Sequence, residues 1–306
     1  MDGGCIAITS YARDERCTLW LRQQAAILRN NPDFGLATCE YAAGIVKVFE
    51  GQYLANKVMA NAARQVICTA ILALYHNRDR RRSGVAMTCL QRVTSALGLC
   101  SKSTTALTVD LLERIGHVTR IQDELDHRSL LIQPTGLLVS CVQDIVRVSL
   151  SAADRMFPAR QYRAFMQGDG DLLERYFVSS LKSLLNTDVL VDHHASRLFA
   201  NSDSGQMLLC KLMSSRQSHA DTLVNFPFEE IANLYGVSRT HIRRLMKVAE
   251  AEGLVRLHER GGRRVEILPP LTEMFGKIVA SHIAKVQFDI HLANEDCDLL
   301  PVDLCA

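Results

Sequence analysis

The chain has 306 residues, of which 48% are hydrophobic, 22% are charged and only 6% are aromatic, with a formal net charge of +2. This length predicts about two domains, and the apolar content is sufficient for a sizeable core, which excludes general disorder. A charge so close to neutral means that any surface for nucleic acid must come from local clusters of basic residues.

Ten cysteines are scattered along the chain without a Cys-x-x-Cys pair, which is typical of reduced thiols in the cytoplasm. We expect no metal and no cofactor, because the adjacent His193 and His194 would point about 100° apart on a helix. The amino terminus lacks the pattern of a signal peptide, and no apolar run approaches the length of a membrane span. The sequence therefore predicts a cytoplasmic protein without membrane contact.

Residues 11–75 and 154–220 are rich in Leu, Ala and Val and are expected to be mostly helical. A break within the second set is expected at Gln167–Asp171, where glycines alternate with aspartates. The basic run Arg78–Arg82 fits two interpretations, an exposed loop or a contact with phosphate. The end of the chain, 296–306, is expected to be a flexible tail.

Two segments, Cys89–Thr119 and Phe228–Arg256, share one pattern of glycines, apolar residues and hydroxyl side chains. Their aligned pairs include Gly98 with Gly236, Gly116 with Gly253, Val93 with Ile231, Ser101 with Ser238, and Val118 with Val255. A pattern that recurs in one frame predicts two tandem copies of one supersecondary unit. We therefore expect the domains 1–150 and 151–295.

The second copy shows the local signals of two helices joined by a tight turn. Apolar residues on one face predict the first helix: Phe228, Ile231, Ala232 and Tyr235. Gly236 suits the positive φ that ends a helix, and Ser238 is a good amino-terminal cap for the next one. The second helix is expected to end at Gly253 and to bury four residues: Ile242, Leu245, Val248 and Ala249.

A hairpin is predicted after these helices. Strands are expected at Leu254–Leu257 and Arg264–Leu268, around a turn that is centred on two glycines. Pro269 and Pro270 stop the second strand, and a helix is expected from about Leu271 to Leu292. This order is that of a winged helix-turn-helix, predicted at about 204–285 and again at about 60–140. The expected fold is mainly α with small β-hairpin wings, duplicated in tandem with pseudo-two-fold symmetry.

The segment Phe228–Arg256 contains Gly-Val-Ser-Arg-Thr and ends in Ala-Glu-Gly-Leu-Val. It resembles the DNA-binding domains of bacterial winged-helix transcription regulators, of the multiple-antibiotic-resistance-regulator (MarR) and catabolite-activator types. The resemblance implies contact with double-stranded DNA, and flanking helices that form a dimer interface and line a pocket for a small-molecule effector. Two units in one chain, where MarR proteins have one, imply either a monomeric pseudo-dimer or a homodimer.

The basic and hydroxyl residues of the second copy are expected to face DNA. They come from the second helix with its cap and from the wing: Ser238, Arg239, Thr240, Arg243, Arg244, Lys247, Arg260, Arg263 and Arg264. His241 falls at the edge of the buried arc, where packing is the favoured interpretation. Weaker contacts are expected from the first copy at Ser101, Lys102, Ser103 and Thr104.

The two copies differ in charge. Ser238–Leu268 holds eight basic and four acidic residues, a net charge of +4, whereas Ser101–Gln133 holds four basic and five acidic residues, a net charge of −1. Phosphate would repel the acidic first wing, Gln122–Asp126. The second copy is therefore predicted to be the main reader of DNA, and the first a weaker reader, a scaffold or a partner surface.

These patterns lead to one hypothesis and two alternatives. The hypothesis is a sequence-specific transcription regulator; the alternatives are a plasmid replication initiator and a tandem winged-helix subunit that binds proteins. The chain is not expected to be an enzyme, because it lacks a glycine-rich phosphate loop, a Gly-x-Ser-x-Gly elbow and an acidic metal cluster.

Overall fold

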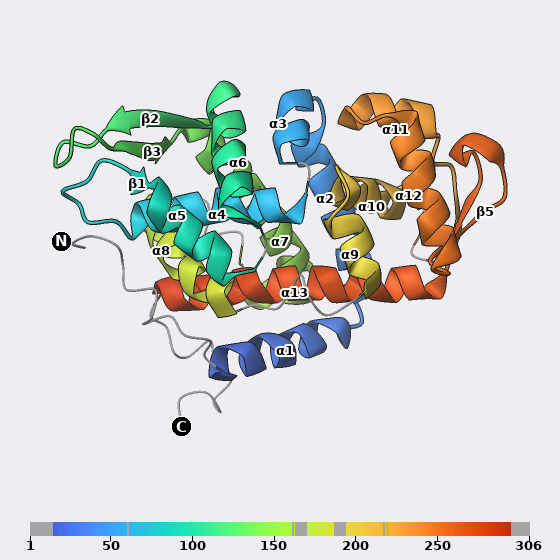
Figure 1. The fold of residues 1–306 in the computed structure, drawn as a ribbon. Helices are drawn as coiled ribbons and strands as arrows, with labels where there is room; N and C mark the ends of the chain where they lie inside the picture. The colour runs from blue at the N-terminus through green and yellow to red at the C-terminus, as the bar shows by residue number, and fades with distance from the viewer. Residues whose placement is uncertain are drawn as a thin grey trace.

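The computed structural model describes residues 15–59, 61–98, 100–160, 162, 170–186, 194–216, 218 and 220–294. This part of the chain is mainly helical, with two small antiparallel sheets of three strands each (Figure 1). The amino-terminal stretch 1–14, the expected tail 296–306, His193 and residues 167–169 of the expected break lie outside the described residues.

A single helix, α1 (Glu15–Arg29), comes first and is followed by the first half of the fold. The first half consists of α2 (Phe34–Phe49), α3 (Tyr53–Val58), α4 (Ala62–His76), β1 (Val85–Ala86), α5 (Met87–Ala96), α6 (Lys102–Arg114), β2 (Val118–Gln122), β3 (Leu130–Pro134) and α7 (Gly136–Met156). A short 3-10 helix, Pro158–Arg160, follows α7. The sheet has the order β1-β3-β2.

The second half has the same order of helices and strands as the first. It consists of α8 (Gly170–Asn186), α9 (His194–Ala200), α10 (Gly205–Ser214), β4 (Leu223–Val224), α11 (Phe228–Tyr235), α12 (Arg239–Ala251), β5 (Val255–Leu257), β6 (Val265–Ile267) and α13 (Pro269–Asn294). Its sheet has the equivalent order β4-β6-β5.

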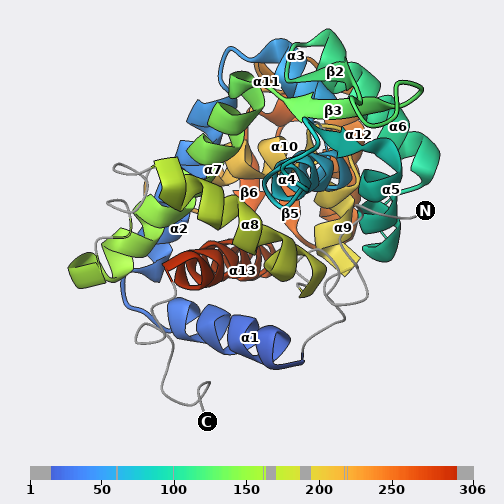
Figure 2. The same ribbon diagram turned by 90° about the vertical axis from the view of Figure 1, so that its left-hand side faces the viewer.

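The two halves pack into each other. Helix α2 packs against α7 of its own half and against α10 of the second half, and α8 packs reciprocally against α13 and α4. Helices α7 and α13 also contact each other, and α1 runs along the outer side of α13 (Figures 1 and 2). Buried side chains from both halves consequently form one continuous hydrophobic core.

Local residue chemistry explains the two helix-turn-helix segments. Gly98 and Gly236 follow α5 and α11 with φ of +64° and +67°, a conformation that glycine adopts without steric cost. Ser101 and Ser238 then cap α6 and α12, where each hydroxyl accepts a hydrogen bond from the backbone N–H three residues later, at 3.1 and 3.0 Å.

The predicted second hairpin is present, with β5 and β6 joined by a turn in which Gly261 and Gly262 have positive φ. The third strand of each sheet, β1 or β4, was not predicted, because two residues are too short for an alternating pattern. Helix α13 starts at Pro269, two residues earlier than predicted, since proline is tolerated in the first turn of a helix.

Among the described residues, one helix, α7, has the length and apolar composition needed to cross a membrane, which the sequence pattern did not predict. Helix α7 contacts α2, α4 and α13, and its buried residues belong to the common core. In the most apolar stretch of α7, 44% of the residues are buried, so core packing accounts for part of its apolar character, which is compatible with a soluble protein.

Candidate nucleic-acid interface

Helix α12 has one buried face and one basic face. Its buried side chains are Ile242, Leu245, Met246 and Ala249. The opposite face exposes every residue of α12 predicted to meet DNA: Arg239, Thr240, Arg243, Arg244 and Lys247. The prediction that Val248 is buried was wrong, since its side chain is 41% exposed. The buried face is turned toward Met246, which leaves Val248 at its edge.

The position of α12 is fixed at its amino-terminal end by the cap and by one long-range hydrogen bond. The cap Ser238 is exposed, and the Nε2 atom of His241 lies 2.9 Å from the backbone oxygen of Asp203, in the turn between α9 and α10. His241 is partly buried, so its ring packs against the protein, as its place on the helix predicted. Helix α9 also contacts α12 directly.

The β5–β6 hairpin presents three exposed arginines, Arg260, Arg263 and Arg264. Its turn is anchored because the N–H of Phe226 donates to the oxygen of Gly262 at 2.8 Å. A Cβ atom at Gly262 would lie 2.0 Å from the oxygen of Phe226, so only glycine fits there. The turn that carries these arginines is therefore held by the backbone of Phe226 and by the ring of Phe228, which also lies close to Gly262.

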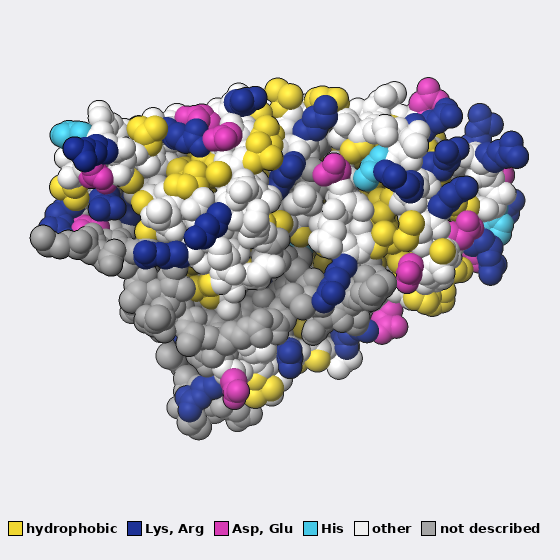
Figure 3. Space-filling view, in the orientation of Figure 1, with side chains coloured by type: hydrophobic (Ala, Val, Ile, Leu, Met, Phe, Trp, Pro, Cys, Tyr) yellow, Lys and Arg dark blue, Asp and Glu magenta, His cyan; other side chains and the backbone are white. Residues whose placement is uncertain are grey.

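Most of the basic side chains on α12 and the hairpin have no acidic partner. Arg239 lies 3.7 Å from Glu229, and both side chains are exposed. Within the described ranges, six other basic side chains form no ion pair: Arg243, Arg244, Lys247, Arg260, Arg263 and Arg264. Lys and Arg gather at the end of the molecule that carries α12 and β5 (Figure 3). This end can therefore attract a polyanion.

At the base of the hairpin the charges are balanced. Glu266 on β6 lies 2.8 Å from Nε2 of His258 and 3.3 Å from a guanidinium nitrogen of Arg256. These contacts, with the His258 hydrogen bond first among them, lower the pKa of Glu266. The unpaired positive charge of the hairpin is thus concentrated at its tip.

The equivalent surface of the first half is different. Ser101, Lys102 and Ser103 are exposed, whereas Thr104 is partly buried and its hydroxyl lies 2.9 Å from that of Ser101. Arg120 on β2 donates to Glu113 at 2.6 Å and also contacts Asp110, both on α6. Arg120 therefore offsets only one of these two carboxylate charges, and this face of α6 keeps a net negative charge.

The first wing, which in the structure is the whole β2–β3 hairpin (Val118–Pro134), is less acidic at its surface than the sequence count predicted. Asp123 is buried, with 2% of its side chain exposed, and its Oδ2 atom lies 3.8 Å from Nε of Arg82. Glu124 and Asp126 are exposed. The charge count was too acidic because it covered one segment and omitted Arg82, the ion-pair partner of Asp123 from a distant segment.

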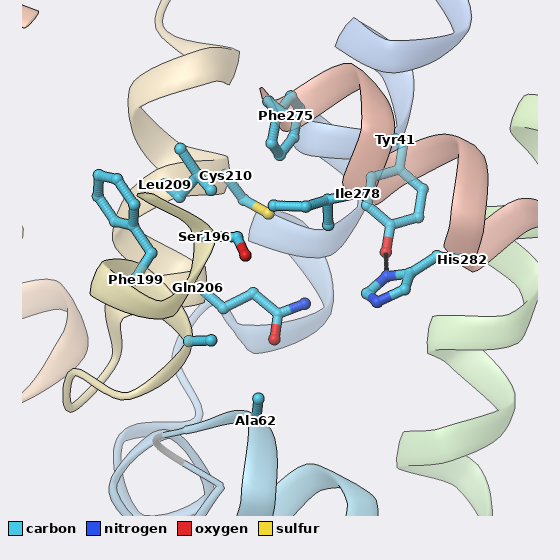
Figure 4. A pocket seen from close by; sticks show the side chains of 11 residues that line it. Tyr41, Ala62, Ser196, Phe199, Gln206, Leu209, Cys210, Phe275, Ile278 and His282 are labelled. Atoms are coloured by element: carbon cyan, nitrogen blue, oxygen red, sulfur yellow. Dashed lines mark hydrogen bonds between the residues drawn. The ribbon is translucent and has the colours of Figure 1, made fainter. Parts of the chain in front are cut away.

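A small cavity of about 30 Å³ lies between α2, α9, α10 and α13, and Ala62 at the start of α4 completes its wall. Its walls are mostly apolar, while the Gln206 amide and the Ser196 hydroxyl point into it (Figure 4). Tyr41 and His282 lie at one side, and the Tyr41 hydroxyl is 2.8 Å from Nδ1 of His282. Burial lowers the pKa of His282 to about 4, so this lining is uncharged at neutral pH.

No sequence pattern indicated this cavity, because its lining residues come from five helices that are spread over most of the chain. In the part of the chain that the structure describes, no group of three His, Cys, Asp or Glu side chains is arranged to hold a metal ion. The described cysteines are all free thiols.

No family model matches the chain, and no curated protein or solved structure is significantly similar to it. The features available for a functional argument are therefore the fold and its surfaces. These are a helix-turn-helix followed by a hairpin in each half, with exposed and unpaired basic side chains on α12 and on the hairpin that follows it.

Proposed function

We propose that the protein is a sequence-specific DNA-binding transcription regulator. The observation that carries this proposal is the set of six unpaired basic side chains on α12 and the β5–β6 hairpin. Helix α12 would lie in the major groove, where arginine can form paired hydrogen bonds with guanine. The hairpin would act as a wing that contacts the backbone or the minor groove.

We further propose that the two halves are tandem copies of one winged helix-turn-helix unit, in which α6 is the counterpart of α12. The identical element order, the equivalent sheet orders and the reciprocal packing of α2 and α8 support this. In this proposal the chain is a pseudo-dimer in the cytoplasm, and the first unit is a weaker reader or a scaffold.

A second candidate function, binding of another protein, is favoured by the first unit. Three leucines on α6 and the first wing are more than half exposed: Leu107 at 54%, Leu125 at 60% and Leu130 at 58%. Exposed leucines beside a cluster with a net negative charge, Arg120 with Asp110 and Glu113, are more typical of a protein contact than of a DNA contact. A replication initiator would use the same basic surface at a single origin.

The test is selection of duplexes from a random DNA pool, followed by fluorescence anisotropy on the enriched sequence. The Arg243→Ala/Arg244→Ala variant should lose about 1–3 kcal/mol of specific binding for each base contact removed. The matched control is Arg29→Ala/Arg147→Ala, which removes the same charge from exposed positions on α1 and α7. Equal binding by both variants would contradict the proposal that α12 contacts the bases of DNA.

Mapping of the bound DNA across a genome separates the alternatives. Enrichment at promoters identifies a regulator, and enrichment at one origin identifies an initiator. Absence of any enriched sequence, in the random pool and in the genome, would reject DNA reading and favour the protein-binding role.

A further inference from the structure

The segment 77–84, which we name the arginine loop, has a defined structure that its composition does not predict. The guanidinium of Arg78 stacks on the ring of Tyr75, 3.6 Å from its centroid, and its Nε donates to the oxygen of Arg82 at 2.9 Å. Asn77 donates to the oxygens of Ala73 and Val178 at 2.8 and 3.1 Å. These contacts hold the loop on α4 and α8.

The arginine loop is also tied to the first wing. Arg82 reaches the buried carboxylate of Asp123, whose other oxygen accepts from the N–H of Leu125 at 3.0 Å. The chain then enters β1, which pairs with β3 of the wing. A Cβ atom at Gly84 would lie 2.8 Å from the oxygen of Ile132, so the loop approaches β3 closely. Loop and wing therefore form one rigid end of the molecule.

This arrangement buries or pairs some charges and leaves others exposed. Arg80 and Arg81 are exposed, although Arg81 also contacts Asp79 at 2.9 Å, and Arg128 is exposed at the wing tip. Asp123 is withdrawn from the surface, whereas Glu124 and Asp126 stay exposed, and Asp126 accepts hydrogen bonds from Ser129 and from the N–H of Arg128. Lys and Arg side chains accordingly appear at this end of the molecule, opposite α12 (Figure 3).

We propose that the arginine loop and the tip of the first wing bind the sugar–phosphate backbone of DNA, through Arg80, Arg81 and Arg128, without reading sequence. This inference rests on the proposed function and names a second point of contact for the same partner. Arginines on a loop fit phosphate, because they supply charge and donors but no helix that could enter the major groove. The first unit would thus contribute affinity, while α12 contributes sequence preference.

The inference is tested by the salt dependence of binding to a fluorescein-labelled 30-base-pair duplex of arbitrary sequence, measured by fluorescence anisotropy. The slope of log K against log salt concentration is negative, and each lost phosphate contact lowers its magnitude, called the slope below, by about 0.9. The variant Arg80→Gln/Arg81→Gln should therefore lower the slope by about 2, and by the same amount on a second duplex of unrelated sequence.

The matched control is Arg29→Gln/Arg147→Gln, which removes two exposed arginines on α1 and α7. Its slope should stay within about 0.3 of the wild-type value, because loss of net charge alone breaks no phosphate contact. A thermal melt of each variant verifies that the fold is kept. An equal fall of the slope in the control and the loop variant would overturn the inference.

A reference variant, Arg243→Gln/Arg244→Gln, separates this inference from the proposed function. If the loop variant keeps the wild-type slope while the α12 variant lowers it, the arginine loop makes no contact and α12 still binds DNA. If the wild-type protein binds neither duplex at low salt, both the inference and the proposed function are wrong.

Discussion

The ring of Tyr53 on α3 packs directly on Gly236, in the turn between α11 and α12. A Cβ atom at Gly236 would lie 2.5 Å from Cε2 of Tyr53, and its φ of +67° is a conformation that other residues adopt only with strain. This contact joins the first half of the chain to the turn that positions the basic helix. Gly98 occupies the corresponding turn of the first half, where no atom lies within 4 Å of such a Cβ.

The pair Gly236→Ala and Gly98→Ala separates steric contact from backbone strain. Both variants should lose about 1–2 kcal/mol of unfolding free energy from the left-handed backbone alone. Gly236→Ala should lose about 1 kcal/mol more, because the Tyr53 ring, which is 46% exposed, must rotate away from the new Cβ atom. Urea unfolding measures the difference, and Tyr53→Ala combined with Gly236→Ala should recover part of it. Equal losses for the two single variants would contradict the Tyr53 contact.

The sequence predicted the elements whose causes are local. The turns at Gly98 and Gly236 and the caps at Ser101 and Ser238 depend on the conformational range and hydrogen bonds of single residues, so the two helix-turn-helix segments were predictable. The buried face of α12 was predicted except at Val248, because helical periodicity sets the direction of a face but not its exact edge.

Long-range partners were not predictable from the same patterns. Arg120 is neutralised by Asp110 and Glu113, and Asp123 is buried against Arg82, but the sequence count treated each of these charges as free. The cavity beside His282 also depends on which helices meet in the fold. Composition predicts how much charge a segment carries, while tertiary packing decides which charges reach the surface.

The ion pair between Glu229 and Arg239 predicts that DNA affinity increases when the carboxylate of Glu229 is removed. In Glu229→Gln, Arg239 is released toward phosphate, and binding should tighten about two- to fivefold, the range of an exposed ion pair. The matched control is Glu230→Gln, which removes the same charge from an exposed neighbour on α11. Anisotropy titrations at fixed salt measure both. A gain in the control as large as in Glu229→Gln would show that only general charge matters.

The net negative charge on the face of α6 that contacts Arg120 predicts unequal losses in the two halves. Lys102→Ala/Ser103→Ala should weaken binding to the enriched duplex by less than tenfold, because Lys102 is the only basic residue at the exposed start of α6. Arg243→Ala/Arg244→Ala should weaken it by about tenfold or more for each base contact. Anisotropy at one salt concentration compares the two variants, and equal losses would show that both halves read DNA equally.

Two buried histidines predict a loss of stability in mild acid. Burial lowers the pKa of His282 and of His291 to about 4, with smaller contributions from Lys285 and Arg160 respectively. An unfolded histidine titrates near pH 6.5, so between pH 6.5 and pH 4 the unfolded chain binds protons that the folded chain does not. The stability from these neutral histidines is therefore fully present above pH 6.5 and is lost as the pH falls toward 4.

Urea unfolding at a series of pH values from 7 to 5 measures this loss directly. The wild-type free energy of unfolding should fall as the pH falls, with about one proton from each of these two histidines and further contributions of the same sign from His76 and His117, whose pKa values burial also lowers. His282→Gln removes one of them, so its curve should fall less steeply by about one proton, although its stability at pH 7 is lower because the hydrogen bond with Tyr41 is changed. His127→Gln, at an exposed position in the first wing, is the control and should keep the wild-type slope. A wild-type stability that stays constant from pH 7 to 5 would mean that the two rings take up protons in the folded protein, and that they are not buried as neutral groups.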